Sequence, residues 1–270
     1  MSEADSKFAG SIPALYDRYL GPLIFQPYAA DLAQRLSDLK HGNLLEIAAG
    51  TGILTRELAR TLSPHVSIVA TDLNQPMLDF ASAQFHHLRA ITWQQANALD
   101  LPFQDQSFDL VVCQFGVMFF PDKSTAYREV LRVLKRGGRF LFSAWDRLED
   151  NEIPLAVADG VSSLFPHDPP QFMARTPHGY HDKNLIQREV TAAGFEKARI
   201  DSVQLRSRAP SHRDPAIGFC QGSPLRNEIE ARDPGRLEEA TEAAARAVKA
   251  KFGSGPIEGK IQAHVVSARI

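Results

Sequence analysis

Three residues placed after two consecutive apolar runs could bind a nucleoside. Gly50 and Gly52 follow the run "NLLEIAA" (43–49), and Asp72 closes the next run, twenty residues beyond Gly52. Glycines let the backbone turn sharply and approach a ligand, while the amides that open the following helix point into the site. A carboxylate at the second strand end can accept hydrogen bonds from both ribose hydroxyls. Each feature alone also describes an ordinary turn or a helix cap, but together they favour nucleoside binding.

A polar residue in the third such loop extends the same predicted site. In the segment "ANALDLPF" (96–103), the Asn97 side chain could exchange hydrogen bonds with the edge of an adenine ring. Ala98 and Leu99 could offer backbone groups and apolar contact. The glycine loop, the Asp72 carboxylate and the Asn97 amide thus lie at the ends of three successive strand-like runs.

These loops need a scaffold that brings consecutive strand ends to one edge. Four short apolar runs and one weaker run have strand length, which is typical of strands buried on both faces of a parallel sheet, and stretches with helical spacing lie between them. The alternation predicts a Rossmann-like, doubly wound α/β sheet, in which ligands bind at the carboxyl ends of the strands. The predicted strands are 43–49, 66–72, 91–96, 108–115 and 138–145, and the predicted helices are 53–62, 75–87 and 124–134.

The sequence changes in character after Trp145. We expect a helix over 153–165 and a second helix that begins after Asp182 as its N-cap and stops at Gly194. Two alternating segments, 196–208 and 257–270, predict an antiparallel strand pair that completes a mostly parallel, seven-stranded sheet. The helical sequence between them predicts an insertion.

Composition excludes several other classes of protein. The 270 residues contain 30 basic and 32 acidic side chains, so no excess of positive charge is present for gripping phosphate backbones. Cys113 and Cys220 have no second cysteine at a metal-ligand or disulfide-framework spacing, and no window approaches eighteen uninterrupted apolar residues. We therefore expect a cytoplasmic protein with no metal, no nucleic-acid partner and no stable membrane insertion.

Five motifs in order resemble one enzyme family. They are "LLEIAAGTG", "ATDLNQPMLDFA", "NALDLPFQDQSFDLVVC", "FGVMFFPD" and "EVLRVLKRGGRFLFSAWD", which together span about residues 40–146. This series is similar to the class I S-adenosylmethionine-dependent methyltransferases, in particular the small-molecule branch related to ubiquinone and menaquinone biosynthesis (methyltransferase type 11). The resemblance implies that the protein binds S-adenosylmethionine and releases S-adenosylhomocysteine.

The resemblance also assigns roles to individual residues. It implies that Glu46, Gly50 and Gly52 surround the methionine part of the cofactor and that Asp72 binds the ribose. By the same comparison Leu73 and Met77 sandwich the adenine, Asn97 and Ala98 meet its edge, and Gln114 with Phe115 lies near the sulfonium.

Two positions depart from the family pattern. The glycine loop often has Gly at its second position, where this chain has Ala48 and Ala49, and the adenine loop usually has Asp where this chain has Asn97. Small side chains should tolerate the first change, and an Asn carbonyl can still accept from the adenine amino group.

Two other functions stay open at this stage. A nicotinamide-dependent oxidoreductase also has a glycine turn followed by an acidic strand end, but the full G-x-G-x-x-G is absent, since Thr55 stands at the place of the third glycine. A non-catalytic regulatory or assembly protein could keep the cofactor fold without an acceptor pocket.

The acceptor side is expected to come from outside the motifs. The segments 10–29, 175–182 and 217–232 are rich in Phe, Tyr, Leu and Pro, which favours a small, partly apolar acceptor methylated at oxygen, carbon or nitrogen. Candidate catalytic residues are Tyr16, by analogy with a "YD" near the start of related enzymes, and His178 and His181, which could titrate near neutral pH. Taken one at a time, each histidine is more simply explained as a surface or cap residue.

We expect a single domain, 1–270, either monomeric or homodimeric. Its predicted parts are an N-terminal helical cap (1–40), a cofactor-binding core (41–146), a helix and loop region for the substrate (147–195), and the final strand pair (196–270) with its helical insertion (209–252).

Overall fold

The protein is built around one seven-stranded sheet. The computed structural model describes residues 10–85, 91–196 and 198–270. The strands lie in the order β3-β2-β1-β4-β5-β7-β6, so the order reverses between β1 and β4. Their bounds are β1 (Gly42–Ile47), β2 (Val66–Asp72), β3 (Ile91–Gln95), β4 (Phe108–Gln114), β5 (Leu134–Trp145), β6 (Arg199–Ala209) and β7 (Ile257–Arg269).

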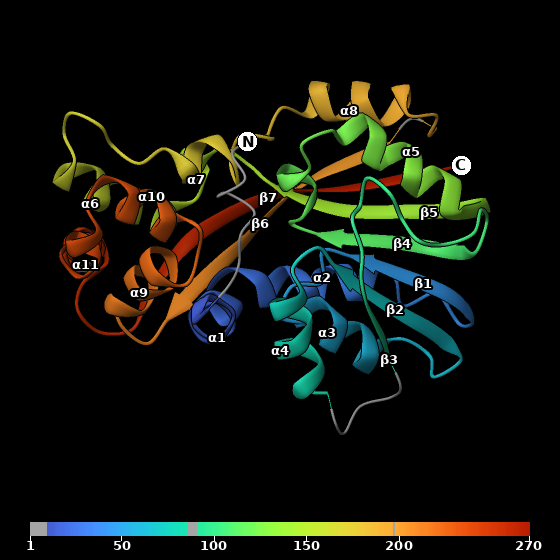
Figure 1. The fold of residues 1–270 in the computed structure, drawn as a ribbon, viewed down its shortest axis with the longest axis horizontal. Coiled ribbons are helices and arrows are strands. Elements are labelled where there is room, and N and C mark those ends of the chain that lie inside the picture. The colour runs from blue at the N-terminus through green and yellow to red at the C-terminus, as the bar shows by residue number, and fades with distance from the viewer. Residues whose placement is uncertain (1–9, 86–90, 197) are drawn as a thin grey trace.

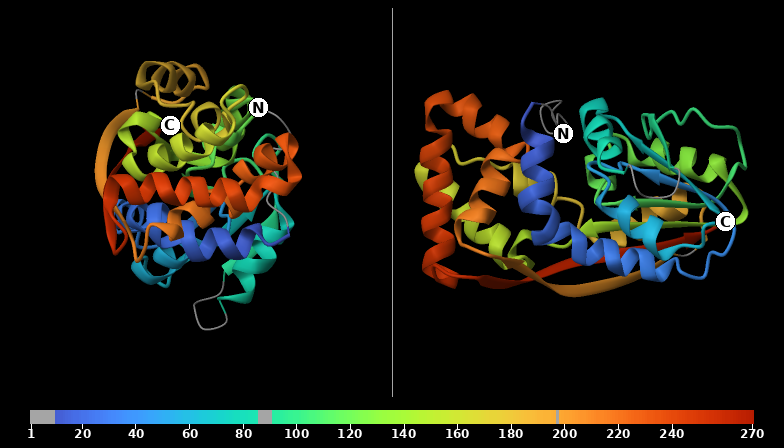
Figure 2. Two further views of the ribbon diagram at one scale, coloured as in Figure 1. Left: turned by 90° about the vertical axis from the view of Figure 1, so that its left-hand side faces the viewer. Right: turned by 90° about the horizontal axis from the view of Figure 1, so that it is seen from below.

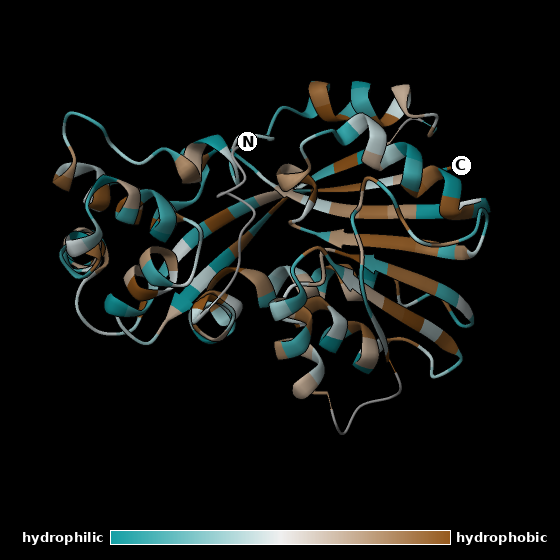
Figure 3. Cartoon of the chain, in the orientation of Figure 1, coloured by the Kyte–Doolittle hydropathy of each residue, from teal (hydrophilic) through white to brown (hydrophobic). Residues whose placement is uncertain are grey.

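The pairing confirms the predicted fold class. β1, β2, β3, β4 and β5 pair in parallel, whereas β7 runs antiparallel to both β5 and β6. The central strands are hydrophobic along most of their length, as Figure 3 shows, because helices cover both of their faces. The carboxyl ends of β1, β2 and β4 therefore meet at the reversal point, where an open α/β sheet binds its ligands.

Helices cover the parallel half of the sheet. α2 packs beside α3, and α5 beside α8; in Figure 1 the second pair lies on the upper side of the sheet and the first on the lower side. The predicted helix over 75–87 is shorter in the structure: α4 ends at Ala83, and His86 and His87 lie outside the described residues. The helix bounds in this half are α2 (Gln26–Arg35), α3 (Ile53–Thr61), α4 (Gln75–Ala83), α5 (Lys123–Val133) and α8 (Lys183–Ala192).

The remaining helices form a cap at one end of the sheet. β6 and β7 continue beyond the other strands, and the helices gather around this extension, on the left in Figure 1; Figure 2 shows the same arrangement from two other sides. The cap consists of α1 (Ile12–Leu15), the π-helix η2 (Tyr16–Phe25), α6 (Glu152–Leu164), α7 (Phe172–Arg175), α9 (Arg213–Gln221), α10 (Leu225–Arg232) and α11 (Leu237–Phe252). Short 3₁₀ turns complete the chain at η3 (Val117–Phe119), η4 (Leu148–Asp150) and η5 (Pro234–Arg236).

Buried hydrogen bonds attach the N-terminal helices to the end of the sheet. The Tyr28 hydroxyl donates to the Val203 carbonyl at 2.8 Å, and the Ser207 hydroxyl donates to the Leu23 carbonyl at 2.8 Å. The first bond runs from α2 to β6, and the second runs from β6 to η2. These bonds hold the N-terminal helices against β6, the edge strand of the antiparallel side of the sheet.

Candidate active site

An open cleft lies at the carboxyl ends of β1, β2 and β4. It has about 780 Å³ of empty space and includes, among its lining residues, most of the side chains that the sequence singled out. Those shared with the sequence prediction are Gly50, Asp72, Leu73, Met77, Asn97, Ala98, Gln114, Phe115 and Tyr16. Segments up to a hundred residues apart are thus brought to one cleft by the sheet order.

Asp72 is the structural centre of this cleft. One carboxylate oxygen accepts from the Gly50 amide at 2.9 Å, and the other accepts from the Asn74 amide at 2.8 Å. Burial raises the pKa of Asp72, while the hydrogen bonds from Asn74 and Gly50 act in the opposite direction. The Asn74 side-chain amide also donates to the second oxygen, at 3.4 Å. A carboxylate has about four acceptor positions, so the side chain can hold the glycine loop and still accept from a ligand hydroxyl.

The glycine loop divides into a ligand-facing part and a packing part. Gly50 lines the cleft with φ +56°, and a Cβ there would meet only the end of the Met77 side chain at 3.8 Å. Gly52, with φ +78°, does not line the cleft: a Cβ there would lie 2.9 Å from the Phe85 ring. The missing side chain at Gly52 therefore makes room for the Phe85 and Trp93 rings, which pack under the glycine loop.

One departure from the family pattern carries backbone strain. Ala48, where the family often has Gly, lines the cleft with φ +55°. Left-handed backbone disfavours residues that have a Cβ, and such residues cluster at functional sites. The small side chain is tolerated in the loop, as the sequence predicts, but in an unfavourable conformation.

The side of the cleft that the family resemblance assigns to adenine is lined by one exposed and one buried apolar residue. Leu73 is 51% exposed, the one large hydrophobic side chain so exposed in the described ranges, whereas Met77 is buried. Asn97 is exposed, and its side-chain oxygen accepts a hydrogen bond from the Leu99 amide at 3.0 Å. This hydrogen bond also fixes the orientation of the Asn97 NH₂ group. This surface suits a flat ring that would cover Leu73.

A smaller cavity of about 290 Å³ continues from Gly50 beneath the N-terminal end of α3. Glu46 and Thr51 line it, and both are 1% exposed. Glu46 accepts a hydrogen bond from the Thr55 hydroxyl at 2.7 Å, and burial raises its pKa to about 8. The Thr51 hydroxyl has no hydrogen-bond partner in the described part of the chain. These buried polar groups, next to the cleft, fit a ligand that carries charges of its own.

The end of β4 separates the cleft from a second cavity. The Gln114 amide group donates to the Phe25 carbonyl at 2.8 Å, which ties the strand end to η2. Phe115 has φ +52°, its amide donates to the Ser143 hydroxyl at 3.1 Å, and its ring stacks on Trp145 with centroids 3.7 Å apart. Phe115 is therefore held in an unfavourable backbone conformation by its neighbours, at the wall between two cavities.

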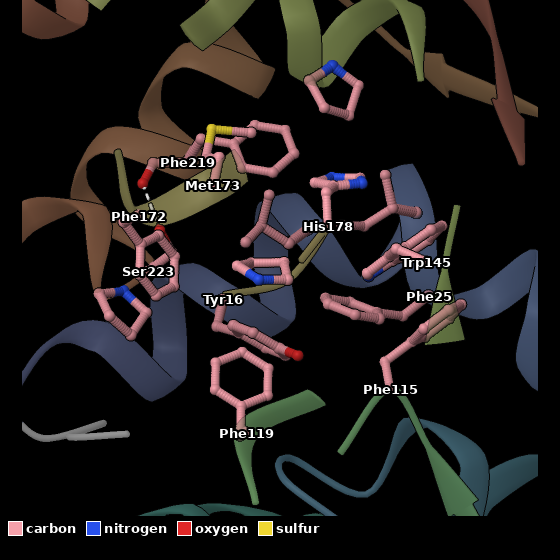
Figure 4. Close-up of a pocket in the computed structure, with 15 residues that line it drawn as sticks. Tyr16, Phe25, Phe115, Phe119, Trp145, Phe172, Met173, His178, Phe219 and Ser223 are labelled. Carbon is pink, nitrogen blue, oxygen red and sulfur yellow. Dashed lines mark hydrogen bonds between the residues drawn. The ribbon is translucent and has the colours of Figure 1, made fainter. Parts of the chain in front are cut away.

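The second cavity, here called the aromatic pocket, lies between the sheet and the cap. It has about 580 Å³ of empty space and shares Tyr16, Phe115 and Phe119 with the cleft. Figure 4 shows these rings together with Phe25 and Trp145 along one side of the pocket. All three segments expected to surround the acceptor contribute to it. The complete lining is Tyr16, Leu20, Ile24, Phe25, Phe115, Phe119, Trp145, Pro154, Phe172, Met173, Pro177, His178, Phe219, Ser223 and Pro224.

His178 is the basic group of this pocket, and His181 is not part of it. The His178 ring projects into the pocket (Figure 4), and its Nδ1 lies 2.7 Å from the Asp146 carbonyl oxygen. Because a carbonyl only accepts, Nδ1 carries the proton and Nε2 keeps a lone pair. Burial lowers the pKa of His178 to about 4. His181 lies outside the pocket lining, with Nδ1 directed to the His178 carbonyl at 2.8 Å.

Tyr16 lies where all three cavities meet. It lines the cleft, the small cavity and the aromatic pocket, and its ring stacks on Phe25 with centroids 4.8 Å apart. Burial, followed by the nearby charges of Asp72 and Asp17, raises the pKa of Tyr16 well above its ordinary value. The hydroxyl therefore stays protonated and can donate a hydrogen bond.

Several lining residues were not predicted from the sequence. Trp145 ends β5 and could have been found by inspecting the end of every parallel strand, and Phe119 lies inside the quoted motif "FGVMFFPD". Phe172 carries no such signal, because it lies on the short cap helix α7 outside the expected segments, whereas Phe219 on α9 lies within the expected segment 217–232. Arg226, in a segment expected to form the cap, pairs with Glu230 at 2.8 Å instead of lining the pocket.

The described residues contain neither a candidate membrane span nor a candidate metal site. No helix in these ranges is long and apolar enough to cross a membrane. No group of three or more His, Cys, Asp and Glu side chains there is placed to hold a metal ion.

The fold and the cleft define an α/β protein that binds a nucleoside-containing ligand beside a separate aromatic pocket. The family model described as "Methyltransferase domain" matches residues 45–142. The ubiquinone/menaquinone biosynthesis C-methyltransferase UbiE of Stutzerimonas stutzeri is 32% identical over 176 residues, which cover 60% of this chain and 68% of that protein. The demethylmenaquinone methyltransferase of Lactococcus lactis is 33% identical over 134 residues, 48% of this chain and 53% of that protein.

Solved structures share the fold at lower identity. The phosphoethanolamine N-methyltransferase 2 of Haemonchus contortus, solved with S-adenosylhomocysteine, has a TM-score of 0.62 at 17% identity and covers 95% of this chain and 56% of that one. The YcgJ protein of Bacillus subtilis has a TM-score of 0.57 at 20% identity and covers 90% of this chain and 98% of that one. These likenesses concern the fold.

The chain belongs to the class I S-adenosylmethionine-dependent methyltransferases, of the ubiquinone/menaquinone C-methyltransferase type. It is an enzyme whose cofactor is S-adenosylmethionine and whose cofactor product is S-adenosylhomocysteine. Membership of this family decides against the two alternatives, a nicotinamide-dependent oxidoreductase and a non-catalytic protein.

Proposed function

We propose that this enzyme methylates a small, uncharged, hydroxylated aromatic ring that binds in the aromatic pocket. The observation that carries the proposal is the lining of that pocket: aromatic and aliphatic side chains surround one imidazole, and none of the described lining residues is Asp, Glu, Lys or Arg. A charged acceptor would lose its hydration there without a partner. A flat ring would stack among Phe25, Phe115, Phe119 and Trp145.

The pocket is placed for direct transfer from the cofactor cleft. Tyr16, Phe115 and Phe119 line both cavities, so an acceptor and a cofactor would meet across these side chains. When bound, the cofactor supplies an electrophilic methyl group on a sulfonium that departs as a neutral thioether. The protein must then bring the nucleophile into line and exclude water, for which an enclosed apolar pocket suffices.

We assign His178 the role of hydrogen-bond acceptor and general base. Its Nε2 lone pair can take the proton of an acceptor hydroxyl, which increases the electron density on the oxygen and on the adjacent ring carbons. The pKa of His178, lowered by burial to about 4, keeps the imidazole neutral at ordinary pH. The relatives named as C-methyltransferases favour transfer to a ring carbon next to the hydroxyl. The Tyr16 hydroxyl, which stays protonated, can donate to the acceptor from the opposite cavity wall.

The cofactor assignments extend the family resemblance to residues that line the cleft. We propose that Asp72 binds the ribose hydroxyls, that Leu73 and Met77 enclose the adenine, and that Asn97 and Ala98 meet its edge. Gln114 and Phe115 would lie beside the sulfonium, while Glu46 and Gly50 would face the methionine part. We also propose that the chain forms one domain with an N-terminal helical cap.

The test is a methyl-transfer screen with radiolabelled S-adenosylmethionine. Hydroquinone and 2-methoxyphenol represent neutral hydroxylated rings, and benzylamine and benzoate represent charged rings of similar size. We expect labelled product with the neutral rings and none with the charged ones. Turnover of benzylamine or benzoate alone would contradict the proposed acceptor class, and mass spectrometry of the product separates carbon from oxygen methylation.

A further inference from the structure

A buried histidine of β7 lies outside the two cavities that the proposed function uses. His264 stands in the strand between β5 and β6, where it is paired with Ala144 on one side and Ser202 on the other. Its side chain is 1% exposed, and it lines neither the cleft nor the aromatic pocket. A buried imidazole needs hydrogen-bond partners for its ring nitrogens, so the groups around His264 show what it holds in place.

The partners of His264 determine which of its nitrogens carries the proton. Nε2 lies 2.9 Å from the His181 carbonyl oxygen and 3.3 Å from a carboxylate oxygen of Asp146. Because both of these oxygens accept hydrogen bonds, Nε2 carries a proton and donates it. Nδ1 lies 3.1 Å from the Ser202 hydroxyl, which can donate to it. Burial lowers the pKa of His264, while the charge of Asp146 acts in the opposite direction, and the neutral ring suits both contacts.

The His181 carbonyl belongs to the loop that carries His178. The His181 ring donates from Nδ1 to the His178 carbonyl at 2.8 Å, and His178 donates from its own Nδ1 to the Asp146 carbonyl at 2.7 Å. His181→Asn would keep its donor to the His178 carbonyl, since the Asn amide group lies near the place of Nδ1. Asp146 contacts His264 in turn through its carboxylate. These four residues thus form a closed network, here called the histidine network, which meets the aromatic pocket at His178.

The sheet holds the other end of the histidine network. Asp146 directly follows β5, and its amide donates to the Gln262 carbonyl of β7 at 3.1 Å. Its carboxylate accepts from the Gln262 side chain at 2.7 Å and from the Arg147 amide at 2.9 Å. The Asp146 carbonyl that accepts from His178 is therefore fixed to β7. The loop of His178 reaches the same strand through the hydrogen bond from His264 to the His181 carbonyl.

We propose that His264 is a positioning residue, which holds the loop of His178 against β7 and so keeps the proton of the His178 ring on Nδ1. The proposal deepens the proposed function and rests on His178 being the base of the aromatic pocket. Only the neutral ring with its proton on Nδ1 has an Nε2 lone pair that can take a proton from an acceptor hydroxyl. A base displaced by about 1 Å, or with its proton on the wrong nitrogen, loses much of its contribution to the rate.

A purely structural role for His264 leads to different expectations. If His264 only fills the core, its replacement lowers the stability of the protein and leaves the ring of His178 and the kcat of the folded enzyme unchanged. If His264 positions the loop, its replacement changes the protonated nitrogen of His178 and lowers kcat. Spectroscopy of the His178 ring and kcat therefore separate the two roles, whereas Tm does not.

The first experiment uses the wild-type protein without cofactor or acceptor. Heteronuclear NMR of isotope-labelled protein at about pH 8, where ordinary imidazoles are neutral, distinguishes a protonated ring nitrogen from an unprotonated one. We expect the proton of His178 on Nδ1 and the proton of His264 on Nε2. A proton on Nε2 of His178, or on Nδ1 of His264, would overturn the proposal. Spectra of His178→Asn and His264→Asn assign the two rings, because each variant lacks one set of signals.

Two substitutions of His264 differ in whether they keep the donor. The Gln side chain places its NH₂ group near the position of Nε2, whereas the shorter Asn side chain ends near Nδ1 and does not reach the His181 carbonyl. His264→Asn should lower kcat about tenfold or more and move part of the His178 proton to Nε2, with the Kd for S-adenosylhomocysteine within about twofold. His264→Gln should keep the wild-type signals of His178 and a kcat within about threefold. Equal kcat values in the two variants would contradict a role for the Nε2 donor.

The matched control is an exposed histidine that precedes β2. His65→Asn should leave the signals of His178 unchanged and kcat within about twofold. A loss of kcat equal to that of His264→Asn would show that the loss does not depend on the histidine network.

A double variant tests whether His264 acts through His178. In His178→Asn/His264→Asn, kcat should lie within about twofold of that of His178→Asn alone, because no base is left to position. Losses that multiply would show that His264 acts by another route and would overturn the proposal. A wild-type kcat in His178→Asn would instead refute the proposed base, while the spectra still test the orientation of the ring, so the two failures are distinguishable.

Discussion

The cofactor cleft and the aromatic pocket are adjacent but are assembled in different ways. Strand ends and the loops that follow β1, β2, β3 and β4 line most of the cleft, whereas the aromatic pocket collects side chains from η2, β5, α6, α7, the loop before α8, and α9. In the cleft, each strand end brings its own functional residue. In the pocket, tertiary contacts between distant helices decide which residues meet. A site built from short motifs can be predicted from the local sequence, but a pocket built from distant helices cannot.

The two regions also bury titratable groups of opposite kind. Glu46, beside the cleft, is a buried acid whose pKa is raised to about 8, and His178, in the aromatic pocket, is a buried base whose pKa is lowered to about 4. Both shifts have burial as their main cause, and both favour the neutral form. The difference in charge type means that pH acts on the two regions in opposite directions.

The largest expected effect is the loss of the carboxylate at the centre of the cleft. Asp72→Ala should weaken S-adenosylhomocysteine binding by about a hundredfold or more, because two charge-assisted hydrogen bonds disappear and the Gly50 amide loses its partner. Calorimetry measures the Kd. Asp79→Ala, an exposed residue of α4, is the matched control and should stay within about twofold. If the Kd of Asp72→Ala stayed near the wild-type value, the cleft assignment would be wrong.

The opposite titrations should appear in the stability of the cofactor-free protein. Between pH 4.5 and 8 the folded state keeps a proton on Glu46 that the unfolded chain has lost, so the free energy of unfolding falls as the pH rises, by up to about 5 kcal/mol. Between pH 6.5 and 4 the unfolded chain binds a proton that folded His178 does not, so the free energy of unfolding falls as the pH falls, by up to about 3 kcal/mol.

Urea unfolding at several pH values measures both slopes. The two effects oppose each other between pH 4.5 and 6.5, where both groups contribute. Glu46→Gln should therefore remove the fall in stability between pH 6.5 and 8, and His178→Asn the fall in stability below pH 4.5. Variants that changed both sides together, or neither, would contradict the separate origins of the two slopes.

Removing the base should affect turnover without affecting cofactor binding. His178→Asn should lower kcat about a hundredfold, within the usual contribution of general-base catalysis, while the Kd for S-adenosylhomocysteine stays within about threefold. In the wild type, kcat should not fall on acidification until the pH approaches 4. The assay uses whichever ring of the screen is turned over. His181→Asn is the control, because this ring lies outside the pocket, and a loss of kcat equal to that of His178→Asn would count against a base at position 178.

A change in the far wall of the pocket should affect the acceptor alone. Phe172→Leu removes part of a buried aromatic surface and should raise the KM of the acceptor about fivefold, with an unchanged Kd for S-adenosylhomocysteine. Phe252→Leu, on the cap helix α11 but outside the pocket lining, should change neither quantity. A larger effect on the cofactor than on the acceptor would mean that the two cavities are not separate sites.

The smallest effect is expected at the departure in the adenine loop. Asn97→Asp keeps the side-chain oxygen that accepts from the Leu99 amide at 3.0 Å, so the turn survives, and the Kd for S-adenosylhomocysteine should change by about threefold or less. A change of tenfold or more would show that the NH₂ group of Asn97 makes a contact of its own.

Local patterns predicted the cleft better than the pocket. Buried runs and helical spacing were enough to place the strands, and the strand ends then brought Asp72, Asn97 and Gln114 to one edge. Gly52 shows what a motif leaves out, because its missing side chain also makes room for the Phe85 ring, a contact that only the tertiary structure reveals. The two histidines show the same limit: three residues apart in one loop, one lines the pocket and the other does not.

The sequence by itself determined the doubly wound sheet, the order of the loops at its carboxyl edge and the family of the enzyme. Each of these depends on residue spacing within one strand, helix or turn, which is a local property of the chain. The tertiary structure alone decided that His178 Nδ1 lies on the Asp146 carbonyl, that Thr51 is buried with no hydrogen-bond partner among the described residues and that Phe172 faces Phe119. Burial and hydrogen bonding there depend on which distant segments pack together, and no local pattern encodes that packing.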